Sequence, residues 1–470
     1  MYKNQYNSVL APGVRRALLV LFLLPAIWVA GCKKLITASV PNNQLVSSSI
    51  FLDSITAQSA VNGLYSQFYN GAIGGAGYYS YYITLDPARV ADETYAVSSS
   101  IDDFTNNSLL SSNTNVNALW NDSYKNIYTA NSIIEGAESS STLSATLVQQ
   151  ITGEAKFIRA LCYFYLVNYF GDVPLILSTS VTVNGSLART AASSVYAQIV
   201  TDLTDARNTL AADFSWSQGN RTRANTWAAS ALLARVYLYQ SSWANAETEA
   251  TRVIGQSGLF GLVADPNNVF LKNSTESILS FYTNYNGFPY ISGQTYLTGT
   301  VLPNYAMRNE LLQAFEAGDT RSAKWINSVT YNGIVYKYPY KYKTITLNAN
   351  TEYQVCLRVG EQYLIRAEAR MQQGNITGAQ SDLNAIRNRA GLANTTAGDV
   401  PSLTVAIAHE RQVEMFYEWG ERWLNLKRTG MANTVLGAEK PGWKSTDVLY
   451  PIPQAAISTN SNLVQNPGYN

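Results

Sequence analysis

Residues 231–250 read ALLARVYLYQSSWANAETEA, and residues 363–383 read YLIRAEARMQQGNITGAQSDL. In both stretches apolar residues recur with helical period on each side of a short polar break, which predicts two amphipathic helices joined by a turn. In both, an alanine before the break is followed twelve residues later by an alanine after it. These small residues are Ala234 and Ala246 in the first stretch and Ala367 and Ala379 in the second. We therefore expect two helix hairpins whose helices approach each other closely.

This spacing resembles that of the tetratricopeptide repeat, a helix pair that buries its apolar face only by stacking on neighbouring pairs. The two stretches are degenerate and more than 100 residues apart, so we do not expect a regular array. They predict a mainly α fold with a tetratricopeptide-like helix-pair scaffold.

Other segments extend this scaffold. Residues 153–170, GEAKFIRALCYFYLVNYF, are apolar on nearly every side, which predicts a helix that is buried all round and ends at Gly171. Further upstream, one helical stripe is predicted to be mostly aromatic, with Trp120, Tyr124, Ile127, Tyr128 and Asn131 on it.

Two long excursions, residues 71–117 and 261–350, are rich in Gly, Asn, Ser and Tyr and lack a long helical period. Within the second, tyrosines alternate with lysines from Tyr336 to Lys343, which predicts a strand, and Pro339 places that strand at a sheet edge. The fold class is therefore mainly α with long irregular loop excursions and a few short strands. Binding groups usually lie on such excursions.

The composition excludes several functions. The net charge is +1, which argues against nucleic acid as a partner, since phosphates demand a basic surface. His409 is the single histidine, and three cysteines make no disulfide framework. No phosphate-binding glycine loop is found. We expect no cofactor, no metal site and no catalytic residues. With 32 Tyr and 9 Trp, the chain offers aromatic surface instead.

The N-terminus predicts export. Residues 1–16 carry Lys3, Arg15 and Arg16 and no acid, and residues 17–29 are almost wholly apolar. Thirteen such residues are too few for a membrane span, which needs about 20, and they fit a secretory signal instead. Residues 29–32, Val-Ala-Gly-Cys, resemble a bacterial lipobox. Residues 1–31 are therefore predicted to be a lipoprotein signal peptide, and Cys32 to carry the lipid.

Four long segments, in this order, resemble signature segments of the SusD/RagB family. They are GEAKFIRALCYFYLVNYFGDVPLI from 153, EQYLIRAEARMQQGNITGAQSDLNAIRNRAGL from 361, ERQVEMFYEWGERWLNLKRTG from 410 and LYPIPQAAISTNSNLVQNPGY from 449. The resemblance covers residues 32–470 and implies one nutrient-binding domain, with an N-terminal helical part of about 50–260 and a C-terminal part of about 261–470.

The resemblance also implies a function. Members of this family are non-catalytic lipoproteins of the outer membrane that face the cell exterior. They capture a glycan and pass it to a SusC-like TonB-dependent transporter, so the expected partners are glycan, transporter and membrane. There are two alternative functions. The protein could be a peptide-capturing member of the family or a helical-repeat scaffold that binds proteins. The sequence supports a hydrolase less well than either.

The hydrolase hypothesis depends on a set of carboxylates. Glu410, Glu414, Glu418 and Arg422 recur every four residues, which predicts one charged stripe on a continuous helix. Hydrolysis of a glycosidic bond needs two carboxyl groups across a cleft. A stripe on one helix favours structural ion pairs instead.

The expected ligand site rests on how sugars are bound. Aromatic rings stack on the apolar face of a sugar, and polar side chains satisfy its hydroxyls. We expect two or three loop aromatics to do this. The candidates are Tyr79, Tyr82 and Tyr95 in the first excursion and Tyr285, Phe288, Tyr290 and Trp325 in the second.

Overall fold

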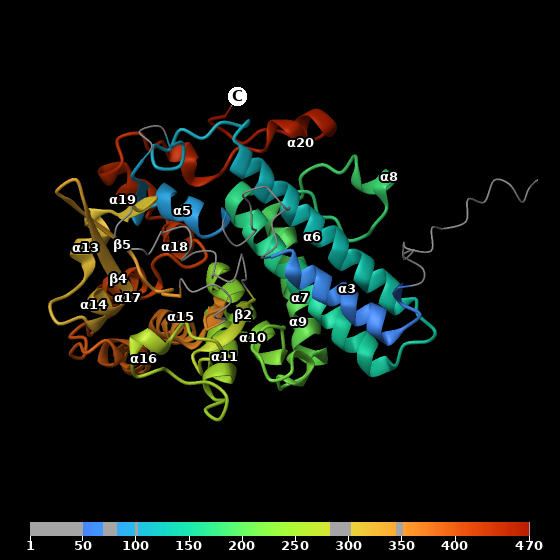
Figure 1. Ribbon diagram of the computed structural model, residues 1–470, viewed down its shortest axis with the longest axis horizontal. Coiled ribbons are helices and arrows are strands. Elements are labelled where there is room, and N and C mark those ends of the chain that lie inside the picture. The colour runs from blue at the N-terminus through green and yellow to red at the C-terminus, as the bar shows by residue number, and fades with distance from the viewer. Residues whose placement is uncertain (1–49, 69–81, 99–101, 283–301, 345–350, 470) are drawn as a thin grey trace, which may run out of the picture. The chain divides into compact units, whose positions relative to one another are not determined.

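The computed structural model describes residues 50–68, 82–98, 102–282, 302–344 and 351–469, and most of them are helical (Figure 1). The elements up to residue 268 are α3 (Ser54–Ser66), α5 (Leu85–Val90), β1 (Thr94–Ala96), α6 (Thr114–Glu138), α7 (Ala145–Phe170), α8 (Val181–Asn184), α9 (Ala192–Thr209), η2 (Ser215–Ser217), α10 (Thr226–Tyr239), α11 (Trp243–Ile254) and η3 (Pro266–Asn268).

The elements after residue 268 begin with strands and return to helices. They are β2 (Ser277–Phe281), β3 (Tyr305–Met307), α13 (Asn309–Ala314), α14 (Thr320–Trp325), β4 (Ile326–Tyr331), β5 (Ile334–Pro339), β6 (Gln354–Arg358), α15 (Val359–Gln372), α16 (Ile376–Arg389), α17 (Val400–Met415), α18 (Glu421–Arg428), α19 (Ala432–Glu439), η4 (Ser445–Val448) and α20 (Gln454–Thr459).

The two predicted helix hairpins are confirmed as α10–α11 and α15–α16. Although they are far apart in sequence, α11 packs directly against α15, so the pairs stack (Figure 1). Ala234 and Ala246 share one buried cluster with Ile365 and Ala369 of the second pair. Small side chains at this junction let the two hairpins approach each other closely.

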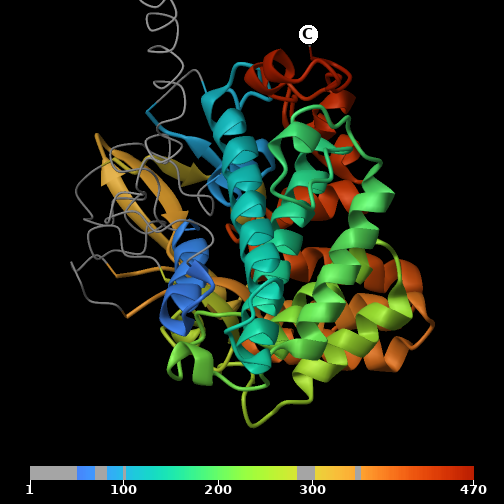
Figure 2. The same ribbon diagram turned by 90° about the vertical axis from the view of Figure 1, so that its right-hand side faces the viewer.

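Helix α7 is the centre of the N-terminal helices, with α6 on one side and α9 on the other. It is buried on most sides, as predicted, and stops at Gly171, whose φ of 72° lies in the region that favours glycine. Helix α3 packs on α6 and α7 (Figure 2). The aromatic stripe of α6 is buried at Trp120, whereas its Tyr128 is 49% exposed.

The strands form three antiparallel pairs within the described residues, β1 with β3, β2 with β6 and β4 with β5. The predicted strand at 336–342 is confirmed only as far as Pro339, where β5 ends. Beyond it the alternation fails, because the ammonium of Lys341 is buried and forms an ion pair with Glu418 at 2.5 Å.

A buried cluster of ion pairs ties the strand-rich segment to the helices. Arg358, at the end of β6, contacts Glu414 at 2.6 Å, Glu418 at 2.8 Å and Glu276 at 2.9 Å. Arg321 of α14 contacts Glu414 at 2.8 Å. The contacting groups come from β6, from α14, from α17 and the residues after it, and from Glu276 just before β2, so the cluster joins elements that are remote in sequence.

The carboxylate stripe therefore forms structural ion pairs, as predicted, but not on one continuous helix. Helix α17 ends at Met415, and α18 begins only at Glu421. Glu418 lies in the break, and Arg422 pairs with Asp92 at 2.5 Å. The break forms because Tyr417 and Trp419 adopt positive φ, which an α-helix does not accept.

Across the described ranges, no helix is both long enough and apolar enough to cross a membrane.

Candidate ligand-binding site

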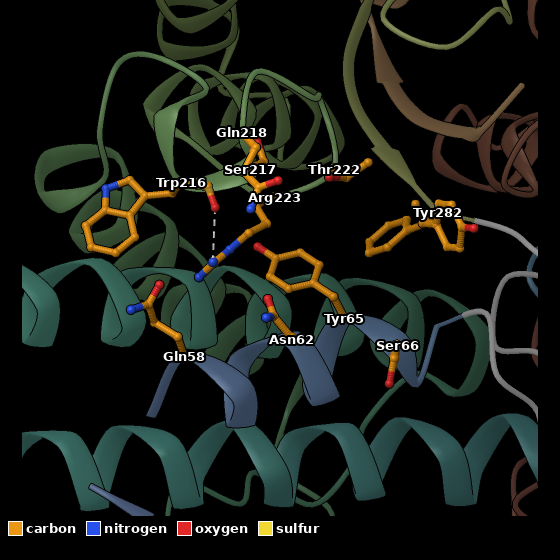
Figure 3. Close-up of a pocket in the computed structure, with 11 residues that line it drawn as sticks. Gln58, Asn62, Tyr65, Ser66, Trp216, Ser217, Gln218, Thr222, Arg223 and Tyr282 are labelled. Carbon is orange, nitrogen blue, oxygen red and sulfur yellow. Dashed lines mark hydrogen bonds between the residues drawn. The ribbon is translucent and has the colours of Figure 1, made fainter. Parts of the chain in front are cut away.

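A surface cavity of about 310 Å³ lies between α3, residues 215–223 and the end of β2 (Figure 3). Aromatic side chains, uncharged polar side chains and one arginine share its wall. The lining residues are Gln58, Asn62, Tyr65, Ser66, Trp216, Ser217, Gln218, Thr222, Arg223, Phe281 and Tyr282.

Helix α3 supplies the amide side of the cavity. Its N-terminus is capped by Asp53, whose carboxylate accepts from the backbone N–H groups of Ile55 and Thr56 at 3.1 and 3.0 Å. One face of the helix is buried in the core, so its other residues are held in place. Gln58 and Asn62 are one helical turn apart and both line the cavity (Figure 3).

The opposite side is a short turn, residues 215–223, that presents Trp216. The carbonyl oxygen of Trp216 accepts from Nη1 of Arg223 at 3.1 Å, the bond drawn in Figure 3. Gln218 takes φ 54°, which turns the chain back tightly. Asn225 then caps α10 by accepting from two backbone N–H groups at 3.1 and 2.9 Å. The indole of Trp216 is half-buried, so part of the ring is open to a ligand.

Helix α7 fixes the position of Arg223 through Glu154. Nε and Nη2 of Arg223 donate to the two carboxylate oxygens of Glu154 at 2.8 and 2.7 Å, and Gln150 donates to the same carboxylate at 2.8 Å. Glu154 is fully buried. Burial raises the pKa of the Tyr65 hydroxyl, and the neighbouring Glu154 raises it further, so this hydroxyl stays protonated. It accepts from the backbone N–H of Ala224 at 2.8 Å.

The third wall is aromatic. The ring of Phe281, at the end of β2, stacks on Phe68 with centroids 4.5 Å apart and contacts Trp419 at 5.6 Å. Tyr282 follows and packs edge-on against Tyr353 at 5.2 Å. These contacts connect the cavity wall to the core and hold its rings in place without a ligand.

The described lining residues carry aromatic rings, amides, hydroxyls and one guanidinium. None of the described residues that line the cavity is Asp, Glu or His, so the cavity itself offers no carboxyl pair for glycoside hydrolysis. Nor do the described parts of the chain hold a group of three or more His, Cys, Asp or Glu side chains suited to a metal ion. The cavity offers rings for stacking and amides, hydroxyls and one guanidinium for hydrogen bonds.

Two of the predicted site residues are not on the surface. Trp325 is 0% exposed, and its indole N–H donates to the carbonyl of Pro266 at 2.9 Å, so the expectation of an exposed platform ring is wrong. Tyr82 is 3% exposed, which is also contrary to expectation. Both rings are buried because remote segments pack over them, Phe270 and Phe416 in the case of Trp325.

Tyr95 is half-buried on β1 and lines a separate cavity with Met307, Arg308, Asn309 and Glu310. The structure therefore does not bring it to the cavity of Figure 3. The other predicted residues lie outside the described residues. They are Cys32, Tyr79, Tyr285, Phe288 and Tyr290.

Sequence reasoning missed the wall residues Trp216, Gln58 and Asn62. For Trp216 a signal was present, because residues 215–220 read SWSQGN, an aromatic residue in a short polar turn like those of the longer excursions. For Gln58 and Asn62 no local signal exists, since amides on a helix surface are common.

Comparisons with known proteins agree with this architecture. A family model described as starch-binding and associating with the outer membrane matches residues 45–238, and the SusD family model matches residues 283–469. SusD-like protein P2 of Formosa agariphila is 27% identical over 519 residues, which cover 96% of this chain and 99% of that protein.

Solved structures show the same fold. A SusD superfamily protein from Bacteroides thetaiotaomicron has a TM-score of 0.73 and 26% identity, covering 88% of this chain and 99% of that one. A laminarin-binding SusD-like protein has a TM-score of 0.71 and 25% identity, with the same coverage.

The fold is thus a scaffold of stacked helix pairs with a surface cavity between α3, residues 215–223 and the end of β2. The two family models match successive parts of the chain, and SusD-like protein P2 aligns with nearly its whole length. The chain belongs to the SusD/RagB family, a carbohydrate-binding family associated with the outer membrane.

Proposed function

We propose that this protein captures an oligosaccharide at the cavity between α3, Trp216 and Tyr282, without cleaving it. The observation that carries the proposal is the wall itself, with aromatic rings at both ends, amides between them and no acid among the described lining residues. Rings stack on the apolar face of a sugar, and amides bond its hydroxyls. Membership of a carbohydrate-binding family and the laminarin-binding relative support this function.

The predicted residues Tyr79, Tyr285, Phe288 and Tyr290 belong to this proposal as further stacking groups. In sequence, residues 69–81 follow Phe68 and residues 283–301 follow Tyr282. Phe281 and Tyr282 both line the cavity, and Phe68 stacks on Phe281. The described residues that immediately precede the two segments therefore lie at or beside the cavity wall.

Release to a partner completes the proposed function. We propose that a SusC-like TonB-dependent transporter receives the glycan, and that lipid on Cys32 holds the protein on the outer membrane, facing the exterior. Family membership and the lipobox-like residues 29–32 support this part.

Binding is tested by removing rings from the cavity. Trp216→Ala and Tyr282→Ala should each weaken binding of laminarin or maltodextrin oligosaccharides by about 1–3 kcal/mol, because one stacked ring is lost. This is about 5-fold to 100-fold in dissociation constant by calorimetry. Trp243→Ala, at another half-buried tryptophan that does not line the cavity, is the control and should bind normally.

The same samples test for cleavage. Oligosaccharide incubated with the wild-type protein should yield no new reducing ends. Normal binding by both cavity variants would place the ligand elsewhere. Binding of peptides but of no glycan would favour the peptide-capturing alternative.

The anchor is tested separately. Cys32→Ala should abolish incorporation of labelled fatty acid and release the protein from outer-membrane fractions, because the acylated thiol is lost. The experiment should use a strain that lacks the proposed SusC-like transporter, because direct contact with that transporter would also retain the protein in the membrane fraction. A variant that stays in the membrane fraction of such a strain would contradict lipidation at Cys32.

A further inference from the structure

Arg223 is the one charged side chain among the described residues that line the cavity. Its charge is already paired, because Nε and Nη2 bond both oxygens of Glu154 at 2.8 and 2.7 Å. A third donor, on Nη1, is taken by the carbonyl of Trp216 at 3.1 Å. A guanidinium has five N–H donors, so two donors of Arg223 have no partner among the described residues, while its positive charge is paired with Glu154.

Among the described residues, no other cation contacts the carboxylate of Glu154. Glu154 is fully buried on α7, and its other polar contacts are neutral, the amide of Gln150 at 2.8 Å and the hydroxyl of Tyr65. Arg223 is itself 8% exposed. The pair is therefore a fixed, neutral unit in the floor of the cavity, and a ligand meets donors there without a net charge.

The segments that follow Phe68 and Tyr282 along the chain are also uncharged in sequence. Residues 69–81, after Phe68, read YNGAIGGAGYYSY, and residues 283–301, after Tyr282, read TNYNGFPYISGQTYLTGTV. Neither segment contains Asp, Glu, Lys, Arg or His, although charged residues make up 14% of the chain.

This arrangement discriminates between sugars by charge. A carboxylate or sulfate group that enters a half-enclosed site loses hydration, and it binds well only where a cation compensates that loss. In this cavity the guanidinium of Arg223 is already paired with Glu154. The negative charge of Glu154 also repels an incoming anion. Neutral hydroxyls lose far less hydration and can bond Gln58, Asn62 and the two remaining donors of Arg223.

We propose that the cavity selects uncharged oligosaccharides over uronate-containing or sulfated ones, and that Glu154 is the positioning residue that sets this preference. The inference rests on the proposed glycan-binding function and adds to it the chemical class of the ligand. Glu154 acts through Arg223, because it is buried beneath the cavity wall.

The first experiment uses the wild-type protein and two forms of one ligand. The probes are laminarin and maltodextrin oligosaccharides, each before and after oxidation of the C6 hydroxyls to carboxylates. The oxidised form of the glucan that binds should bind at least tenfold more weakly, and affinity for the neutral form should hardly change between 50 and 300 mM salt. Equal or tighter binding of the oxidised form would overturn the inference and leave glycan capture intact. Binding of neither form of either glucan would count against the proposed function itself.

Variants then test the role of Glu154. Glu154→Gln leaves the charge of Arg223 unpaired. The affinity for the oxidised glucan, relative to the affinity for the neutral glucan, should therefore rise at least tenfold. High salt should abolish this rise, because it screens the charge of Arg223. This change is buried, so its melting curve is recorded alongside. Gln58→Lys places a free cation on the exposed side of the same wall and should shift the ratio in the same direction even if Glu154→Gln does not fold.

Gln149→Lys is the matched control, since it adds the same charge at an exposed position of α7 that does not line the cavity. Its ratio should equal that of the wild type. If Glu154→Gln folds and keeps the wild-type ratio of affinities for the neutral and oxidised glucans, Glu154 does not set the preference for uncharged ligands. An equal shift in Gln149→Lys would show that net charge, rather than the cavity, decides the preference.

Discussion

Replacing Glu414 by glutamine is expected to lower the free energy of unfolding by about 3–5 kcal/mol. Its carboxylate is fully buried and contacts Arg358 at 2.6 Å, Arg321 at 2.8 Å and Arg389. The amide of glutamine can bond one guanidinium, but it cannot offset the charge of three. The loss is measured by urea unfolding and by the melting temperature.

An exposed ion pair provides the control. Glu247 contacts Arg370 at 2.8 Å, and both side chains are more than one-fifth exposed. Because water screens such a pair, Glu247→Gln should cost less than about 1 kcal/mol. If Glu414→Gln costs no more than Glu247→Gln, the buried cluster does not stabilise the fold in the way that its geometry indicates.

The pH dependence gives a second readout for Glu414. Burial alone would raise the pKa of this carboxyl, but Arg389, Arg358 and Arg321 together hold it well below its usual range. The carboxylate therefore stabilises the fold above the ordinary glutamate pKa of about 4.3, and this contribution is lost as the pH falls toward the folded-state value. The stability difference between wild type and Glu414→Gln should accordingly be constant near neutral pH and shrink below about pH 4.

Replacing Trp325 by alanine is expected to cost about 3–5 kcal/mol of stability, as large-to-small changes in a core do. The indole is 0% exposed, packs against Phe270 with ring centroids 5.7 Å apart, and lies 4.6 Å from the ammonium of Lys341. The variant also leaves the Pro266 carbonyl without the indole N–H that bonds it at 2.9 Å. Thermal unfolding of the two proteins measures the difference.

Trp216→Ala should show the opposite pattern, with weaker glycan binding and a nearly unchanged melting temperature, because the Arg223 bond is made to its backbone carbonyl. The two tryptophans thus separate a core ring from a binding ring. Glycan binding that falls in folded Trp325→Ala, with its stability unchanged, would show that Trp325 contacts the ligand after all.

The helical scaffold was predictable because its signals are local. The alanines of the two hairpins and the apolar run of α7 repeat with the period of a helix, and a helix forms from contacts three and four residues apart. The same holds for the capping and stop signals, such as Gly171. The family resemblance rests on contiguous motifs of the same kind.

The charged stripe shows where local reasoning fails. A four-residue repeat from Glu410 to Arg422 predicts one helix, yet the chain turns at Tyr417 and Trp419. It does so while Arg358, from β6, and Lys341 draw Glu418 into the buried cluster. The partners of Glu418 are 60 and 77 residues away along the chain, and no helical period in the sequence predicts them.

The residues that form the candidate site also depend on contacts between segments that are remote in sequence. By itself the sequence predicted aromatic residues as stacking groups and placed them on loops between helices, and this stays a prediction. Only the tertiary structure decided which ring is open, placing Trp216 opposite Gln58 and Asn62 of α3 and covering Trp325 with Phe270 and Phe416. The physical reason is that helix formation depends on neighbours along the chain, whereas the exposure of a side chain depends on whichever remote segments pack over it.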